Sequence, residues 1–462
     1  MRNSKILSVV VCLLAVAVLS SCSSSGSGGN TQQDSASVFT VGTDAPLPSV
    51  VSCQIMVTGI TIYNGTNNIS VLTNPQVVDF AQLSGLHQLL DLNAVPMGTY
   101  TSATVTISSP VISFIDTTQN PPVINTINGT LSTQSVTVQF ANPFVLLDNS
   151  LVGLRMEFDL RQSLQTDQNG QVTGVVNPVF HMGLLAADDS NVSIDDFHAG
   201  FVGSAGPNTF TVQGPKGRQW TVQMGDNTVM DDSDISVNAY TTNTILSISG
   251  QLDPVSKSID ASEIEVVSTD GFVLGGLLTS VRPPSGPASQ ADLFVRFELP
   301  DINGISDGQI ETFNLTGKEI YRIGHINLPL TTLLFNNSAM AAGQRVDIGG
   351  PITQSNGVDT LTAHRIVLRR QGQAGTWVPG STVIDSGNEG SFQLNDDWTA
   401  GVLLPSPLTV LTTNQTVFIN LSGLSALTGT QPISIRVVGF ILENPSTGLP
   451  VMVARSVEEL AD

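Results

Sequence analysis

Alternation of apolar and polar residues is the feature that most constrains the fold of this chain. In "QSVTVQF" (134–140) and "VGLRMEFDL" (152–160) every second side chain is apolar, which is the period of a half-buried strand. The 42 glycines and 24 prolines supply turns between such segments. The pattern predicts a mostly β fold. Its one exception is a set of leucines at helical spacing, which predicts a short helix over residues 81–90.

The chain has 462 residues, which is too long for one hydrophobic core. We expect an antiparallel β-sandwich at the N-terminus, followed by three small β-barrel-like repeat units. The expected boundaries are a leader at 1–21, a flexible tether at 22–37, the sandwich at 38–187, and repeat units at 197–270, 271–371 and 374–462.

The repeat units are recognised by a hairpin that recurs near the end of each one. A strand ends in glycine, a turn rich in Pro, Asn, Ser and Gly follows, and a second strand carries alanine with an aliphatic residue three positions later. The glycine and alanine pairs are Gly250 with Ala261, Gly350 with Ala363, and Gly439 with Ala454. The copies are separated by whole domains, so the spacing exceeds the 20 to 50 residues typical of solenoid repeats.

The leader has a charged start, with Arg2 and Lys5, and then an apolar run from Ile6 to Leu19. This is the pattern of a secretory signal peptide, and the run is short for a membrane-spanning helix. The segment Leu19-Ser20-Ser21-Cys22 resembles the lipobox of bacterial lipoproteins. The resemblance implies that the Cys22 thiol carries a diacylglycerol and that the chain is cut before Cys22. The alternative is a plain signal peptide with an incidental cysteine.

The lipidated form would be held in the cell envelope through membrane lipid. Two or three acyl chains anchor a protein durably, whereas one does not. Residues 23–37 are rich in Ser and Gly and predict a flexible tether. Ser23, rather than aspartate, follows the cysteine, and by resemblance to known lipoprotein sorting this implies the outer membrane.

Several short motifs after the tether carry a second resemblance. "VGTDAP" begins at Val41, "QIMVTGITIY" follows, and "VVDFAQLSGLHQLLDLNAVPMGTYTSATVTI" contains Pro96-x-Gly98-x-Tyr100. In this order the motifs resemble the domain-of-unknown-function 4382 family of bacterial lipoproteins, with Phe80 where leucine is usual. The resemblance implies a β-sandwich and no activity. The repeat units resemble a second family of small envelope domains, domain-of-unknown-function 5666.

Charge and cysteine usage exclude several partners. The formal net charge is −21, which repels nucleic acid, and we expect the trio Arg365, Arg369 and Arg370 to be solvated strand positions. Of the three cysteines, Cys12 leaves with the leader and Cys22 is lipidated, so Cys53 has no disulfide partner and is expected in the core.

The short motifs that match catalytic or metal-binding patterns lie in sequence contexts that do not fit those functions. Gly304-x-Ser306-x-Gly308 fits the G-x-S-x-G pattern, but a turn between strands is expected there instead of the strand-to-helix elbow that a nucleophile needs. The same loop departs from a calcium-binding EF-hand, and the five histidines lack zinc-site spacing. Other acidic groups that could bind calcium adventitiously are Asp188, Asp189, Asp195, Asp196, Asp231, Asp232 and Asp234. We predict no catalytic residue, no metal and no cofactor.

The expected function is a non-catalytic binding or structural lipoprotein whose partner is an envelope protein or a glycan. Three similar units on one tether would favour a multivalent partner, or they would form a stalk. The alternative function is a secreted β-fold hydrolase that acts on extracellular polymer.

Overall fold

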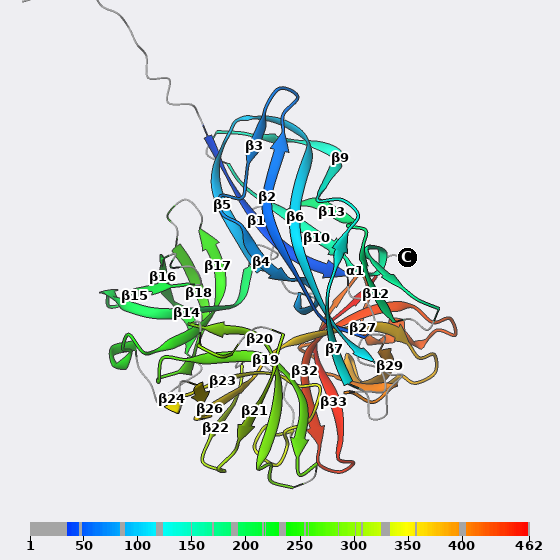
Figure 1. Ribbon diagram of the computed structural model, residues 1–462. Coiled ribbons are helices and arrows are strands. Elements are labelled where there is room, and N and C mark those ends of the chain that lie inside the picture. The colour runs from blue at the N-terminus through cyan, green and yellow to red at the C-terminus, as the bar shows by residue number, and fades with distance from the viewer. Residues whose placement is uncertain are drawn as a thin grey trace, which may run out of the picture.

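The structure is a computed structural model (Figure 1). It describes residues 35–45, 49–83, 88–116, 123–148, 150–168, 171–185, 193–214, 217, 219–230, 237–253, 256, 258–284, 286–300, 302–305, 308–324, 333–355, 358–396 and 403–460. The leader, with the lipobox Leu19, Ser20, Ser21 and Cys22, lies outside the described residues, as does the tether up to residue 34.

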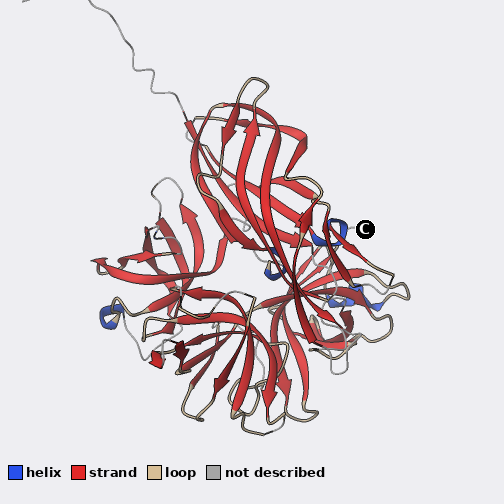
Figure 2. Ribbon diagram, viewed as in Figure 1, coloured by secondary structure: helices blue, strands red, loops and turns tan. Residues whose placement is uncertain are grey.

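Strands account for 66% of the structure and helices for 4%, which confirms the mostly β prediction (Figure 2). The predicted helix over 81–90 is wrong. A short 3-10 helix η1 covers Phe80–Gln82, and strand β5 begins at Gln88. Residues from Gln88 onward pair with strand β1, and Leu90 is buried in the sandwich core. Sheet pairing has overridden the local spacing of the leucines.

The N-terminal domain is a sandwich of two sheets. One sheet has the order β13-β10-β1-β5 and the other has β3-β2-β6-β7, with β4 added to β2 and β9 added to β6. The first sheet contains β1 (Ser35–Ala45), β5 (Gln88–Pro96), β10 (Leu151–Asp159) and β13 (Phe180–Leu185). The second contains β2 (Val50–Tyr63), β3 (Asn68–Ser70), β4 (Gln76–Asp79), β6 (Gly98–Asp116), β7 (Val123–Asn128) and β9 (Ser135–Leu146). Most pairs are antiparallel, but β1 runs parallel to β10.

Aromatic rings fill the sandwich core. The ring of Phe158 lies 5.0 Å from those of Phe80 and Phe180, measured between centroids. A small third sheet extends this domain with β8 (Thr130–Leu131), β11 (Leu164–Thr166) and β12 (Val172–Val176), and the four-residue helix α1 (Leu160–Ser163) precedes β11. Asp79 and the start of β4 lie at the edge of the sandwich that faces the next domain, and this places them at the candidate site described below.

The next strands form a closed barrel, in green in Figure 1. Its strands are β14 (Ser193–Gly206), β15 (Thr209–Gln213), β16 (Gln219–Met230), β17 (Ile245–Asp253) and β18 (Ser258–Ser268). The order around the barrel is β14-β15-β16-β18-β17, and β17 pairs back with β14. Only β16 and β18 run parallel. This order is that of a five-stranded Greek-key barrel of the OB type.

The last strands repeat the same path. They are β27 (Gln371–Trp377), β28 (Val383–Ser386), β29 (Glu389–Asp396), β30 (Leu408–Thr412), β31 (Val417–Ile419), β32 (Ser434–Asn444) and β33 (Leu449–Glu459). The sheet runs β27-β32-β33-β30-β29, β29 closes onto β27, and β30 is parallel to β33. The 3-10 helices of these two barrels are η4 (Val237–Ala239) and η5 (Leu424–Thr428).

The middle unit is an open version of the same barrel. Its strands are β19 (Val273–Arg282), β20 (Gln290–Leu299), β21 (Ile310–Asn314), β22 (Ile320–Ile323), β23 (Arg345–Gly349), β24 (Ile352–Ser355), β25 (Val358–Leu361) and β26 (Arg365–Leu368). The strand order of this sheet is β21-β20-β19-β23-β26-β22, and its two edge strands β21 and β22 do not pair with each other. As in the other units, the strand before the closing hairpin, here β22, runs parallel to the closing strand, here β26. The three units therefore share one topology.

The repeated glycines are explained by the approach of the two hairpin strands. A Cβ atom added to Gly250, Gly350 or Gly439 would lie 2.3, 1.8 or 2.1 Å from the carbonyl oxygen of Asp260, Thr362 or Val453, respectively. Each of these carbonyls belongs to the residue before the repeated alanine. The pattern detected in the sequence thus marks a place where the partner backbone leaves no room for a side chain.

Neighbouring units share cores, and strands run across two of the expected boundaries. Strand β14 begins before the boundary at 197, and β27 spans the boundary between 371 and 374. The core of the middle unit includes Phe440 and Leu442 of the last unit. Val51 of the sandwich packs in one cluster with Leu277 and Phe294 of the middle unit. Within the described residues, no helix is long and apolar enough to cross a membrane.

Candidate functional site: a cleft beside a buried ionic cluster

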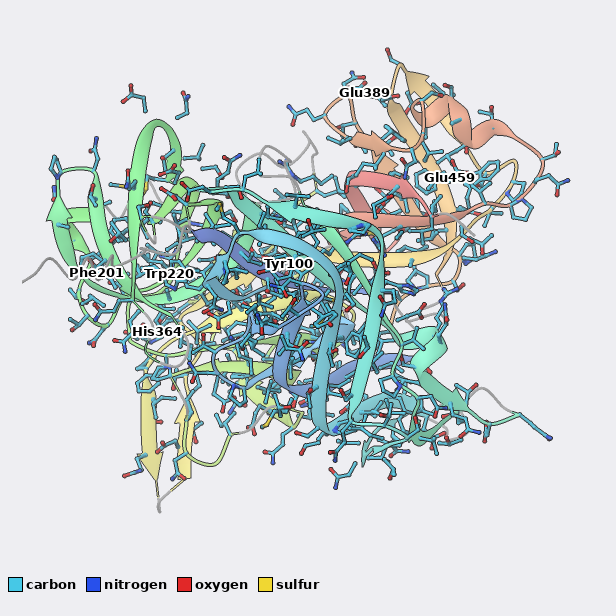
Figure 3. The ribbon with its side chains drawn as sticks, turned by 90° about the horizontal axis from the view of Figure 1, so that it is seen from above. Tyr100, Phe201, Trp220, His364, Glu389 and Glu459 are labelled. Carbon is cyan, nitrogen blue, oxygen red and sulfur yellow. The ribbon has the colours of Figure 1, made fainter. Side chains whose placement is uncertain are left out.

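A cleft of about 1340 Å³ lies where the sandwich, the first barrel and the middle unit meet. Its walls come mainly from β2 and β4, from β14 to β16, and from β20 and β23. Prominent lining residues are Gln54, Gln76, Asp79, Asp196, His198, Phe201, Trp220, Arg296, Phe297 and Arg345. Figure 3 labels Phe201 and Trp220 close together on the barrel. The cleft is therefore built by residues that are far apart in the chain.

A buried arginine holds the barrel against the middle unit. Arg369, just after β26, is 1% exposed. Its Nη1 donates a hydrogen bond to Glu265 Oε2 of the barrel at 2.5 Å and lies 3.6 Å from Asp196 Oδ1. Its Nε donates to Asp347 of β23. One guanidinium thus bridges three carboxylates from two units.

His198 completes this arrangement. Its Nε2 hydrogen bonds with Asp347 Oδ2 at 2.7 Å, and its ring lies 4.7 Å from the ring of Phe297. We call the set Asp196, His198, Glu265, Asp347 and Arg369 the ionic cluster. It crosses the interface between the barrel and the middle unit, so it fixes two of the three cleft walls relative to each other.

Electrostatics keeps the ionic cluster charged. Burial disfavours the ionised form of Asp347, but Arg369 and His198 outweigh burial and lower its pKa to about 2. Burial also disfavours the charged form of Arg369, but Glu265, Asp347 and Asp196 raise its pKa above the ordinary value. The central ion pairs therefore persist throughout the neutral and mildly acidic range.

A second buried pair joins the sandwich to the middle unit. Asp79 accepts hydrogen bonds from Ser52 Oγ and from the Cys53 backbone N–H, both at 2.8 Å. Arg296 Nη2 donates to the Val51 carbonyl at 2.6 Å. Burial raises the pKa of Asp79 and lowers the pKa of Arg296 to about 10, and the attraction between the two groups opposes both shifts. The hydrogen bond from Arg296 to the Val51 carbonyl joins the third wall of the cleft to the middle unit.

The expectation that Arg365, Arg369 and Arg370 are solvated is wrong, because all three are buried. Arg370 Nη2 donates to Asp195 Oδ1 at 2.6 Å. Asp195 and Asp196, counted above among possible calcium ligands, thus face arginines. Only the fold brings these acids of the first barrel to these bases of the middle unit, so local sequence patterns contained no signal for the cluster.

The other residues singled out in the sequence are dispersed. Ser306 lies outside the described residues, and the loop that contains it joins the antiparallel strands β20 and β21. Cys53 is fully buried in the sandwich core, as expected. His181 and His364 each pair with an aspartate at a different place on the surface. Among the residues that the structure describes, no group of three or more His, Cys, Asp or Glu side chains could hold a metal ion.

Family motifs in the sandwich have clear structural roles. Gly98 has a φ of +155°, a conformation that favours glycine, and turns the chain from β5 into β6. The Tyr100 hydroxyl then donates to the Pro96 carbonyl at 2.8 Å. The segment that ends at Phe80 supplies Asp79 to the cleft and the Phe80 ring to the core.

These features agree with the comparison with known families. Residues 36–173 match the family described as Domain of unknown function (DUF4382). The match covers the sandwich from β1 to the start of β12 and leaves the three barrel units outside it. No curated protein matches the chain. The cleft is therefore formed by the matched region together with two units that lie outside the match.

Proposed function

We propose that this protein is a lipid-anchored lipoprotein of the cell envelope that binds its partner without chemical conversion, and that the cleft is its binding surface. The observation that supports binding most strongly is that buried polar contacts join all three cleft walls: ion pairs of Arg369 join the barrel to the middle unit, and Arg296 donates to the Val51 carbonyl of the sandwich. A preformed concave surface binds with little loss of conformational entropy. The second family resemblance, of the repeat units to domain-of-unknown-function 5666, belongs to the same proposal.

The anchor is argued from the sequence. Cys22 follows a secretory leader and precedes a Ser/Gly tether, and β1 begins soon afterwards at Ser35. Acylated Cys22 would tie the sandwich to the membrane, and Ser23 favours the outer membrane. In Figure 1 strand β1 begins at the end of the sandwich away from the barrels, so the tether would attach at that end.

The shared cores bear on how the repeat units act. Units joined through common hydrophobic clusters and buried arginines form one body, so they present one composite cleft instead of three independent sites. This favours a single partner held between domains over the multivalent binding that the repeats by themselves indicate.

The hydrolase alternative depends on one feature, the raised pKa of Asp79 in the cleft wall. Its two oxygens are already engaged by Ser52 Oγ and by the Cys53 N–H. Asp347 has a lowered pKa and is paired with Arg369 and His198, which suits an ion pair better than a general acid. The binding function is therefore preferred.

Fractionation of the envelope tests the anchor. Cys22→Ser should release the protein to the soluble envelope fraction and remove the mass of the lipid, because the thioether cannot form. Cys12→Ser, in the leader, is the matched control and should leave the protein at the membrane. Unchanged fractionation and mass for Cys22→Ser would contradict the proposal. Turnover of a glycan or ester by the purified protein, abolished in Asp79→Asn or Ser306→Ala, would establish the hydrolase instead.

A further inference from the structure

The chemistry of the cleft surface identifies the class of ligand. Besides the buried ion pairs, the wall presents uncharged carboxamides from two domains. They are Gln54, Asn74, Gln76 and Gln88 of the sandwich and Gln213 of the barrel, and the Nε2 of Gln76 already donates to the Leu90 carbonyl. A carboxamide donates and accepts hydrogen bonds side by side, which matches the hydroxyl groups of a sugar.

One hydrogen-bond donor of this wall, the Gln54 side-chain amide, has no acceptor in the described part of the chain. Its Nε2 is buried and has no hydrogen-bond partner among the described residues. A buried donor without a partner costs about 1–3 kcal/mol. The side chain projects from β2, close to Asp79, with which its residue pairs in the sheet. The Gln54 side chain lines the cleft while its Nε2 is covered, so rotation about its χ angles is needed to bring this donor to a ligand acceptor, which would then satisfy it.

Half-buried aromatic rings add apolar surface next to these amides. Phe197 and Phe297 line the cleft, and Phe297 is held in place by the His198 ring and by its close fit over Gly275. Sugar rings combine hydroxyl edges with C–H faces, so a wall of amides and aromatic rings complements both. The volume of about 1340 Å³ exceeds the roughly 300–1,000 Å³ of typical small-molecule pockets and suits several sugar rings.

Charge decides against anionic glycans. The two arginines that line the cleft are already engaged, because Arg296 donates to the Val51 carbonyl and Arg345 donates to the Arg370 carbonyl and lies 3.7 Å from Asp196. The whole chain has a formal net charge of −21. Long-range electrostatic repulsion would therefore weaken the binding of an acidic polysaccharide to the cleft. We propose that the cleft binds a neutral oligosaccharide, with the Gln54 carboxamide donating to a sugar oxygen. This inference depends on the proposed binding function and names its ligand class.

Binding is tested with the full chain carrying Cys22→Ser and a panel of neutral hexasaccharides, namely cellohexaose, chitohexaose, maltohexaose and xylohexaose. Titration is followed by calorimetry and by tryptophan fluorescence, because Trp220 lines the cleft. We expect at least one hexasaccharide to bind and to change the fluorescence.

Gln54→Met separates a binding role from a structural one. It keeps the size of the side chain and removes the unsatisfied amide, so the melting temperature should be unchanged or higher while the affinity falls about tenfold. Gln139→Met is the matched control, because Gln139 is exposed on β9 and does not line the cleft, and it should bind as the parent does.

Two results would overturn the inference. One is a folded protein that binds none of the four hexasaccharides, and the other is binding that Gln54→Met leaves unchanged. Binding of an extended peptide in their place would assign the cleft to a protein partner. None of these outcomes affects the anchoring test with Cys22→Ser, so failure of the ligand class and failure of the anchor can be told apart.

Discussion

Removal of Arg369 is the sharpest test of how the domains are held together. Arg369→Met replaces a fully buried guanidinium by an apolar side chain of similar length and leaves Glu265 and Asp347 without their shared cation. Removing one partner of a buried ion pair typically costs about 3–5 kcal/mol, because the remaining charge stays buried. Asp196 also lies 3.6 Å from this cation, so the upper part of that range is expected.

The stabilities of the parent and of Arg369→Met should depend on pH in different ways. In the parent, Asp347 has a folded pKa of about 2, below the ordinary value of 3.8, so its contribution is complete at neutral pH and is lost progressively as the pH falls from about 4 to about 2. In Arg369→Met, burial acts on the same carboxylates without the cation and raises their pKa values. The variant should therefore recover part of its stability as the pH is lowered from 7 to 5, a range in which Asp347 of the parent stays ionised.

Urea unfolding measures both effects on protein that carries Cys22→Ser. Trp220 in the first barrel reports the transition of the domain that donates Glu265 and Asp196. Arg282→Met is the matched control, because Arg282 pairs with Asp292 while its side chain is 47% exposed, and exposed pairs contribute about 0–1 kcal/mol. Equal losses in the two variants, or an Arg369→Met variant as stable as the parent at pH 7, would refute the reasoning.

The remaining predictions concern a repeat glycine, a cleft histidine and acid. Gly439→Ala should cost about 1–3 kcal/mol, because the new Cβ would lie 2.1 Å from the Val453 carbonyl, whereas Gly429→Ala, with open space around it, should change the melting temperature little. His198→Leu should lower the free energy of unfolding in urea by about 1–3 kcal/mol, because it removes the hydrogen bond between His198 Nε2 and Asp347 Oδ2. A variant as stable as the parent would show that this hydrogen bond does not stabilise the interface. Below about pH 4 the parent should lose the contribution of Asp347 progressively towards pH 2, as followed by circular dichroism, and a flat profile there would show that this group does not stabilise the fold.

The amino-acid sequence predicts those features of the fold that depend on residues close together in the chain. Strand content follows from the alternation of side chains, because successive residues in a strand face opposite sides of the sheet. The hairpin glycines were detectable for the same reason, since the two strands of a hairpin are close in the chain and Gly250 or Gly439 meets its partner backbone after a short turn. The Pro96-x-Gly98-x-Tyr100 motif likewise closes on itself through the Tyr100 hydroxyl.

The places where distant strands and charges meet could not be predicted from sequence patterns, because they depend on the packing of whole domains. Leu89 and Leu90, two of the leucines at helical spacing, lie in β5 because β1 offered a partner edge, and local spacing does not report such an edge. Arg369 looked like one of three surface cations because its partners Asp196 and Glu265 belong to another barrel. The cleft depends on the same long-range packing, since the carboxamide of Gln54 and the ring of Phe297 face one space only after the sandwich and the middle unit have docked. Such contacts depend on the packing of whole domains, and a local sequence pattern records only the conformation of its own segment.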